Sequence, residues 1–189
     1  MAGTTETIRA GDEARLGDGV EFEGARFEGL ALVEASLRDA TFLDCCFIGC
    51  DLTMARMDGA TVRGVRFEDC RLLGVDVGAW RADGLGIEAA FVSCDLDRLQ
   101  AGGADLTACR FEGGRARRAA FDRCDLRGVA FDDVDLSGAR FRGCDLTGSD
   151  LRTARGYRID PHDNRVEGLR VALPEALSFL AELGLELDA

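Results

Sequence analysis

The chain carries a hydrophobic residue at every fifth position over most of its length. The series runs without exception from Phe22 to Val77 and resumes from Phe91 to Leu151. Ten of the eleven phenylalanines occupy this central position. Neither the 3.6-residue period of a helix nor the 2-residue period of a strand produces such a series. The pattern therefore indicates a structural repeat of five residues.

Two other positions of the repeat are nearly as regular. The residue two before the centre is usually Ala or Cys, and half of the 24 glycines fall two residues after it. Residues two apart point to the same side of an extended backbone, so the small and the central residues both face inward, and glycine permits a bend. Four units would close a square coil, and coils stacked ~4.8 Å apart would pair their backbone groups.

Several units match the A(D/N)LXX repeat of the pentapeptide repeat proteins. Examples are Ala104-Asp105-Leu106-Thr107, Cys124-Asp125-Leu126-Arg127-Gly128 and Cys144-Asp145-Leu146-Thr147-Gly148. The sequence resembles this family over the range from Phe22 to Leu151. The resemblance implies an all-β solenoid, a right-handed quadrilateral β-helix.

This interpretation divides the chain into three parts. Residues 1–19 form an N-terminal segment that is partly flexible or caps the first coil, and residues 20–153 form the β-helix. Residues 154–189 form a C-terminal cap with a dimerisation helix. The spacing between Val77 and Phe91 falls one residue short of three full repeats, so the register slips at 78–90.

The slip contains the only tryptophan of the chain. Trp80 lies beside Arg81 and Asp83, a composition that suits contact with a protein partner. Alternatively, Trp80 covers an imperfect corner of the core. Both interpretations stay open on the sequence alone.

A short helix is expected near the C-terminus. Pro174 and Glu175 suit its first turn and Gly184 its C-terminal cap, which predicts a helix over 176–183. Its apolar residues are Leu173, Leu177, Phe179, Leu180 and Leu183. The minimal role of such a helix is to cover the last coil. A similar helix pairs two solenoids in the quinolone-resistance proteins called Qnr and MfpA, and the resemblance to them implies a homodimer.

Charge narrows the choice of partners. The chain carries 35 acids and 23 bases, all of them Arg, for a net charge of −12. Direct binding to nucleic-acid phosphates is therefore disfavoured, whereas a basic protein partner fits. Outward residues one coil apart should stack into columns, one of Asp105, Asp125 and Asp145, and a second in which Arg115 interrupts Asp95 and Asp135.

These acids allow two interpretations. They are the solvated face of a generic repeat, or they form an acidic rod that imitates duplex DNA. The resemblance to Qnr and MfpA implies the second, with DNA gyrase and topoisomerase IV as partners that are protected from quinolones or natural-product poisons. The alternative is a solenoid scaffold that binds an unrelated protein. An apolar strip of Val33, Thr53 and Leu73 is either covered by the N-terminal segment or used by a partner.

Catalytic and metal-binding chemistry is not indicated. Seven of the eight cysteines occupy the small inward position, which favours core filling, and only Cys46 faces outward. His162 is the only histidine, and no nucleophile and base are paired. We predict no enzymatic activity, metal or cofactor. No apolar run approaches the ~18 residues of a membrane span, and the N-terminus lacks the apolar core of a signal peptide, so we expect a cytoplasmic protein without a membrane partner.

Overall fold

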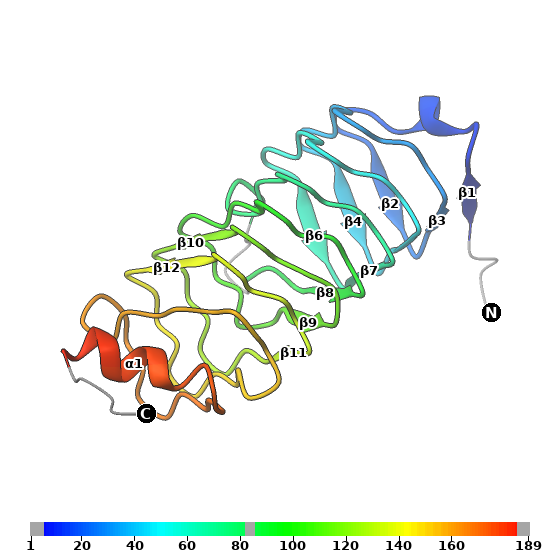
Figure 1. Cartoon of the computed structure of the whole chain (residues 1–189). Helices are drawn as coiled ribbons and strands as arrows, with labels where there is room; N and C mark the ends of the chain where they lie inside the picture. The colour runs from blue at the N-terminus through cyan, green and yellow to red at the C-terminus, as the bar shows by residue number, and fades with distance from the viewer. Residues whose placement is uncertain (1–5, 82–85, 185–189) are drawn as a thin grey trace.

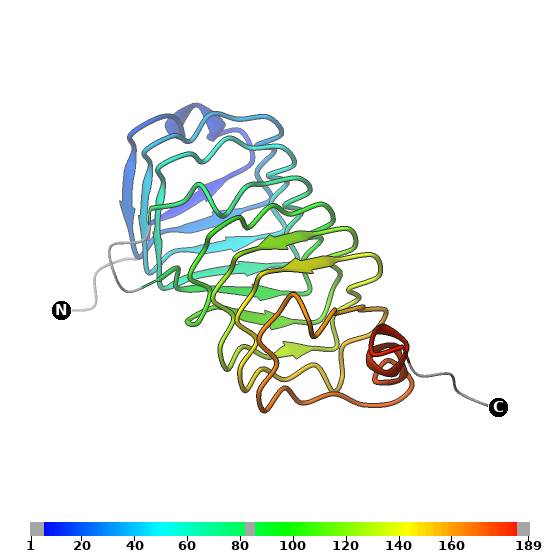
Figure 2. The same ribbon diagram turned by 90° about the vertical axis from the view of Figure 1, so that its left-hand side faces the viewer.

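The chain winds into a parallel β-solenoid (Figure 1). The computed structural model describes residues 6–81 and 86–184. Successive coils stack along one axis, so the first strand and the C-terminal helix lie at opposite ends (Figures 1 and 2). No helix in these two ranges is long and apolar enough to cross a membrane.

Each coil has four faces, which we number in chain order. The first face carries β2 (Glu21–Glu23), β4 (Thr41–Leu43) and β6 (Thr61–Arg63). The second carries a seven-stranded sheet of β1 (Thr7–Arg9), β3 (Arg26–Glu28), β5 (Cys46–Ile48), β7 (Val65–Glu68), β8 (Ala89–Val92), β9 (Arg110–Glu112) and β11 (Phe131–Asp132). The third face is held by single bridges such as Asp51↔Arg71, and the fourth carries β10 (Ala120–Asp122) and β12 (Arg140–Arg142). A 3-10 helix, η1 (Glu13–Arg15), and α1 (Leu177–Glu182) lie near the two ends.

The strand register confirms the predicted coil. Phe22 pairs with Phe42, and Phe27 pairs with Phe47, so the partners are separated by four repeats. The central residues of the repeat fill the core, where Phe47, Phe67, Phe91, Phe111 and Phe131 stack with ring centroids 4.7–5.4 Å apart. The predicted β-solenoid with a short C-terminal helix is therefore confirmed.

Most corners, two residues after a centre, have a left-handed backbone; the exceptions among the described corners are Ala79, Ala108 and Thr153. Corner glycines such as Gly24 and Gly128 have φ values of 63° and 70°. All ten described non-glycine residues with positive φ fall at the same position: Glu34, Asp39, Asp44, Met54, Asp69, Ser93, Arg98, Arg118, Arg123 and Asp133. Most corners thus adopt one backbone conformation whether or not glycine occupies them.

The register slip expected at 78–90 takes the form of one longer coil. Phe67 pairs with Phe91, so this coil exceeds the usual four repeats by four residues. Arg81 still bridges Thr61 of the coil before it, and the Ile87 N–H already donates to the Asp105 carbonyl of the coil after it (3.0 Å). The additional residues therefore lie between Arg81 and Ile87, which leaves the coils on either side in register.

Backbone pairing extends beyond residues 20–153 in both directions. Thr7 pairs with Arg26 at one end, and Asp150 bridges Arg170 at the other. Residues outside the repeat consensus fill the inward positions there. Asn164 accepts a bond from the Cys144 N–H (2.9 Å) and donates one to the Phe141 carbonyl (3.0 Å). The C-terminal segment between 154 and 170 is consequently continuous with the solenoid.

Candidate partner-binding surfaces

Three aspartates form a continuous column on the first face, which we call the acidic column. Asp105 bridges Asp125, and Asp125 bridges Asp145, so the three are stacked at the ~4.8 Å step between coils. The Asp105 carboxylate accepts bonds from the Thr107 hydroxyl (2.7 Å) and N–H (3.1 Å). These local bonds fix the Asp105 side chain at the turn. The Arg127 guanidinium, by contrast, bonds both carboxylate oxygens of Asp125.

Neighbouring donors favour the charged form of two members of the acidic column. A hydrogen bond from the Arg127 side chain lowers the pKa of Asp125, and one from Thr147 lowers the pKa of Asp145. Arg127 pairs with Asp125 (2.6 Å) and Arg165 with Asp145 (3.6 Å), whereas Asp105 has no ion pair with any residue in the described ranges. The least compensated charge of the column is therefore at Asp105.

The third face carries a column in which acids and arginines alternate. Its members are Asp51, Arg71, Asp95, Arg115, Asp135 and Arg155. Arg115 lies 2.5 Å from Asp95, and Arg155 lies 4.0 Å from Asp135. Arginines thus pair with Asp95 and Asp135 here, as they do with Asp125 and Asp145 on the first face.

The slip residues occupy different environments. Trp80 is buried, with its ring 6.2 Å from that of Phe67 and its indole Nε1 without a partner among the described residues. Its burial supports the interpretation that it covers the core and corrects the expectation of a surface contact. Arg81 is exposed and pairs with Asp39 (3.3 Å), and Asp83 lies outside the described residues.

The residues expected to dimerise do not share one environment. Leu173, Leu177 and Leu183 are 72%, 42% and 52% exposed. Phe179 and Leu180 are half-buried, and Phe179 packs against the core of the solenoid. The Glu182 carboxylate lies 3.4 Å from the Arg158 guanidinium. The short helix α1 therefore packs Phe179 against the solenoid and exposes Leu177, and Leu173 and Leu183 are exposed in the segments on either side of it.

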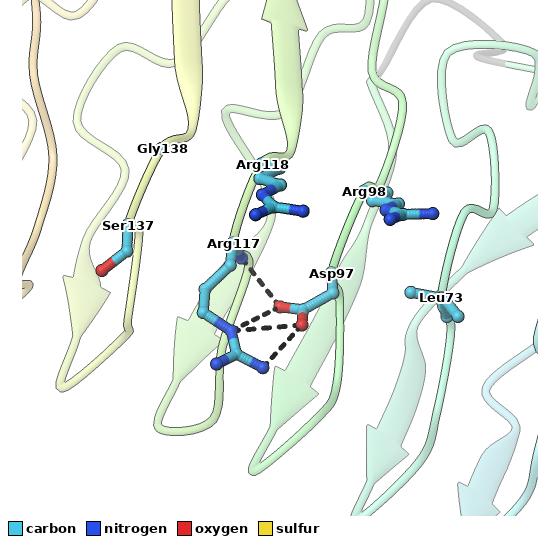
Figure 3. A pocket seen from close by; sticks show the side chains of 7 residues that line it. All are labelled: Leu73, Asp97, Arg98, Arg117, Arg118, Ser137 and Gly138. Atoms are coloured by element: carbon cyan, nitrogen blue, oxygen red, sulfur yellow. Dashed lines mark hydrogen bonds and ion pairs between the residues drawn. The ribbon is translucent and has the colours of Figure 1, made fainter.

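A groove at the corner between the third and fourth faces was not expected from the sequence (Figure 3). It has a volume of about 710 Å³ and is lined by Leu73, Asp97, Arg98, Arg117, Arg118, Ser137 and Gly138. Arg117 pairs with Asp97 (2.8 Å). Burial opposes ionisation of Asp97, but the bonds from Arg117 outweigh it and lower its pKa. The available signal was that Arg98 and Arg118 occupy the same corner position one coil apart.

Two expected absences stay predictions. In the ranges 6–81 and 86–184, no group of three His, Cys, Asp or Glu side chains is arranged to hold a metal ion. The backbone N–H of His162 donates to the Asp160 side chain, which shapes the exit turn. Neither observation tests the predicted lack of a cofactor or of enzymatic activity.

Comparisons with known proteins agree with the repeat pattern. A family model described as a pentapeptide repeat region matches residues 20–80, and one described as pentapeptide repeats (8 copies) matches residues 117–152. Two trypsin-treated variants of QnrB1, a plasmid-mediated fluoroquinolone resistance protein, have similar structures. One has a TM-score of 0.56 and 19% identity and covers 90% of this chain and 84% of its own. The other has a TM-score of 0.52 and 17% identity and covers 97% and 92%. No curated protein sequence matches at a significant level.

Proposed function

This chain belongs to the pentapeptide repeat family, and we propose that it binds a type II topoisomerase, DNA gyrase or topoisomerase IV, and changes that enzyme's response to quinolones or natural-product poisons. The solenoid shares its fold with QnrB1, a fluoroquinolone resistance protein, which makes an enzyme targeted by quinolones the first partner to test. At 17–19% identity the similarity extends to the fold alone. The proposal therefore depends on the surface of this chain.

The acidic column is the observation that carries the proposal. Its three carboxylates repeat every ~4.8 Å along a rod, and one DNA strand carries a phosphate every ~3.4 Å of helix axis. Arg165 bridges Asp145 and ends the column, and the exposed Glu88 lies near Thr107 at its other end. A protein surface shaped and charged to bind duplex DNA would meet a similar line of anions here, and binding would exclude DNA from that surface.

A gyrase assay tests the proposal directly. The protein is titrated into supercoiling and DNA-cleavage reactions with and without a fluoroquinolone. We expect the native protein to restore supercoiling and reduce drug-stabilised cleavage, and we expect the triple variant D105N/D125N/D145N to have lost most of this effect. Asparagine keeps the oxygen that accepts the Thr107 N–H bond (3.1 Å), so the turn is preserved.

The matched control removes charges from another face. The variant E68Q/E112Q/D132N changes three acids on the second face. If both triple variants retain full activity, the acidic column is not the contact. If the native protein itself has no effect on gyrase or topoisomerase IV, the alternative of a scaffold for an unrelated partner is favoured. The column of alternating acids and arginines on the third face is then the surface to test.

We also propose that α1 and its flanking residues form a homodimer contact. The exposed Leu173, Leu177 and Leu183 are the supporting observation. Light scattering should give the mass of a dimer for the native protein and of a monomer for L177E/L183E. The control V33E introduces a glutamate at a position that is 52% exposed near the other end. A monomeric native protein, or a dimer broken only by V33E, would contradict this assignment.

A further inference from the structure

The corner groove has an uncompensated positive charge. In Figure 3, Arg98 and Arg118 lie on neighbouring coils without any bonded partner among the residues drawn, while Arg117 turns to Asp97. Neither Arg98 nor Arg118 forms an ion pair with a residue in the ranges 6–81 and 86–184, although seventeen pairs occur there. A pair of arginines with free donors is suited to carboxylates.

The two arginines occupy positions that favour glycine. Arg98 has a φ of 59° and Arg118 a φ of 56°, and the stacked corner positions on either side are Gly74 and Gly138, each with a φ of 70°. An L-residue is strained in this region, and glycine is not. The side chains of Arg98 and Arg118 are therefore held at a site where replacement by glycine would relax the backbone.

The groove continues into an apolar surface toward the N-terminus. Leu73 lines its end, Met54 lies beside Gly74 at the next corner, and Val33 follows one coil further. Met54 and Val33 are 53% and 52% exposed. From Leu73 to Gly138 the groove crosses three steps between coils, roughly 14 Å, which is the length of about four extended residues.

We propose that this groove binds an acidic segment of a partner protein, with carboxylates at Arg98 and Arg118 and neighbouring apolar side chains on Leu73 and Met54. A peptide is favoured over a nucleic acid, because apolar side chains next to its carboxylates can pack on Leu73 and the exposed Met54. This surface is independent of the acidic column, which lies on the first face and carries the opposite charge.

The test uses fluorescence anisotropy with a fluorescein-labelled peptide, Leu-Ala-Leu-Glu-Glu-Ala-Glu-Glu, on the full chain. We expect binding that weakens with added salt, and a roughly tenfold or greater loss of affinity in R98G/R118G. The glycines suit the backbone at both positions, so this variant should fold at least as well as the native protein. The matched control is R123G, which removes an arginine from a left-handed corner (φ 56°) outside the groove and should bind within about twofold of the native protein.

Additional peptide and protein variants distinguish between the possible ligands. The same peptide with Lys in place of Glu should not bind, and L73S should weaken binding of the acidic peptide. The variant D105N/D125N/D145N should bind the peptide normally, so failure of the topoisomerase proposal would leave this result unchanged. Equal affinities for native protein and R98G/R118G, absence of peptide binding, or tighter binding of a single-stranded oligonucleotide would each overturn the proposal.

Discussion

The inward cysteines bond the backbone as well as filling the core. The Cys70 thiol donates to the carbonyl of Phe47 (3.3 Å) and the Cys94 thiol to that of Phe67 (3.4 Å), a central phenylalanine of the preceding coil in each case. Burial raises the pKa of Cys94 to about 11 and that of Cys109 to about 12. These thiols therefore stay protonated at neutral pH and lack the reactive thiolate.

Cys46 should be the one cysteine that reacts in the folded protein. It is half-buried and faces outward on β5, whereas the other seven are buried. Burial raises its pKa, so we expect slow modification of one thiol by Ellman's reagent at pH 8 and of all eight in guanidinium chloride. The variant C46S should show no native reaction. Rapid modification of several thiols in native protein would mean that the coils open readily.

The corners show what the sequence can predict at the scale of single residues. Recurrent glycine predicts a bend, and Gly24 and Gly128 confirm it. The same left-handed backbone at Glu34 and Met54 could not be predicted, because local preference opposes it. Pairing with the next coil imposes it: the Glu34 N–H donates to the Thr53 carbonyl (2.8 Å) and the Met54 N–H to that of Leu73 (2.8 Å).

At the scale of the elements, the turn at Asp150 shows how arginines connect one coil of the solenoid to the next. Asp150 pairs with Arg152 in its own turn (2.8 Å) and with Arg170 of the following coil (3.1 Å). A hydrogen bond from the Arg152 side chain is the main cause that lowers the pKa of Asp150 to about 2. This carboxylate therefore links two turns of the solenoid only while it is ionised.

The variant D150N should lose a pH-dependent contribution to stability. The native-state pKa of about 2 lies below the unfolded value near 3.9, so the contribution is complete above about pH 4 and is lost as the pH falls toward 2. We expect D150N to be about 1 kcal/mol less stable at pH 7 and equal to native protein near pH 2, measured by urea unfolding. A difference that is independent of pH would mean that the ion pairs do not contribute.

Sequence patterns predict where a helix or strand lies better than they predict what its side chains contact. The helix expected over 176–183 occurs over 177–182, because Pro174 and Gly184 act locally. That Phe179 packs inward while Leu177 stays exposed depends on the shape of the last coil. The groove has a similar origin, since Leu73, Arg98 and Arg118 meet only when the longer coil stacks in register with its regular neighbours.

At the scale of the whole molecule, each coil contacts only its neighbours. The ring of Phe111 stacks between those of Phe91 (5.2 Å) and Phe131 (4.7 Å), one in each neighbouring coil. Phe179, on α1 at the C-terminal end (Figure 1), packs against the core there. In such an array the effect of a substitution depends on its position along the axis, because stability is a sum of terms between neighbouring coils.

Two substitutions at different positions along the axis should therefore destabilise different numbers of coils. F111A removes a fully buried ring from the centre of the stack, and we expect a loss of about 3–5 kcal/mol in the free energy of unfolding. F179D should detach α1 and raise amide hydrogen exchange around Val166 and Leu169, while the coils that contain Phe47 and Phe67 keep their protection. Mass spectrometry of exchange in both variants distinguishes the cases. If F179D exposed the amides of the first coils as much as those of the last, unfolding would be cooperative along the entire rod, and the N-terminal coils would depend on the C-terminal cap that they never touch.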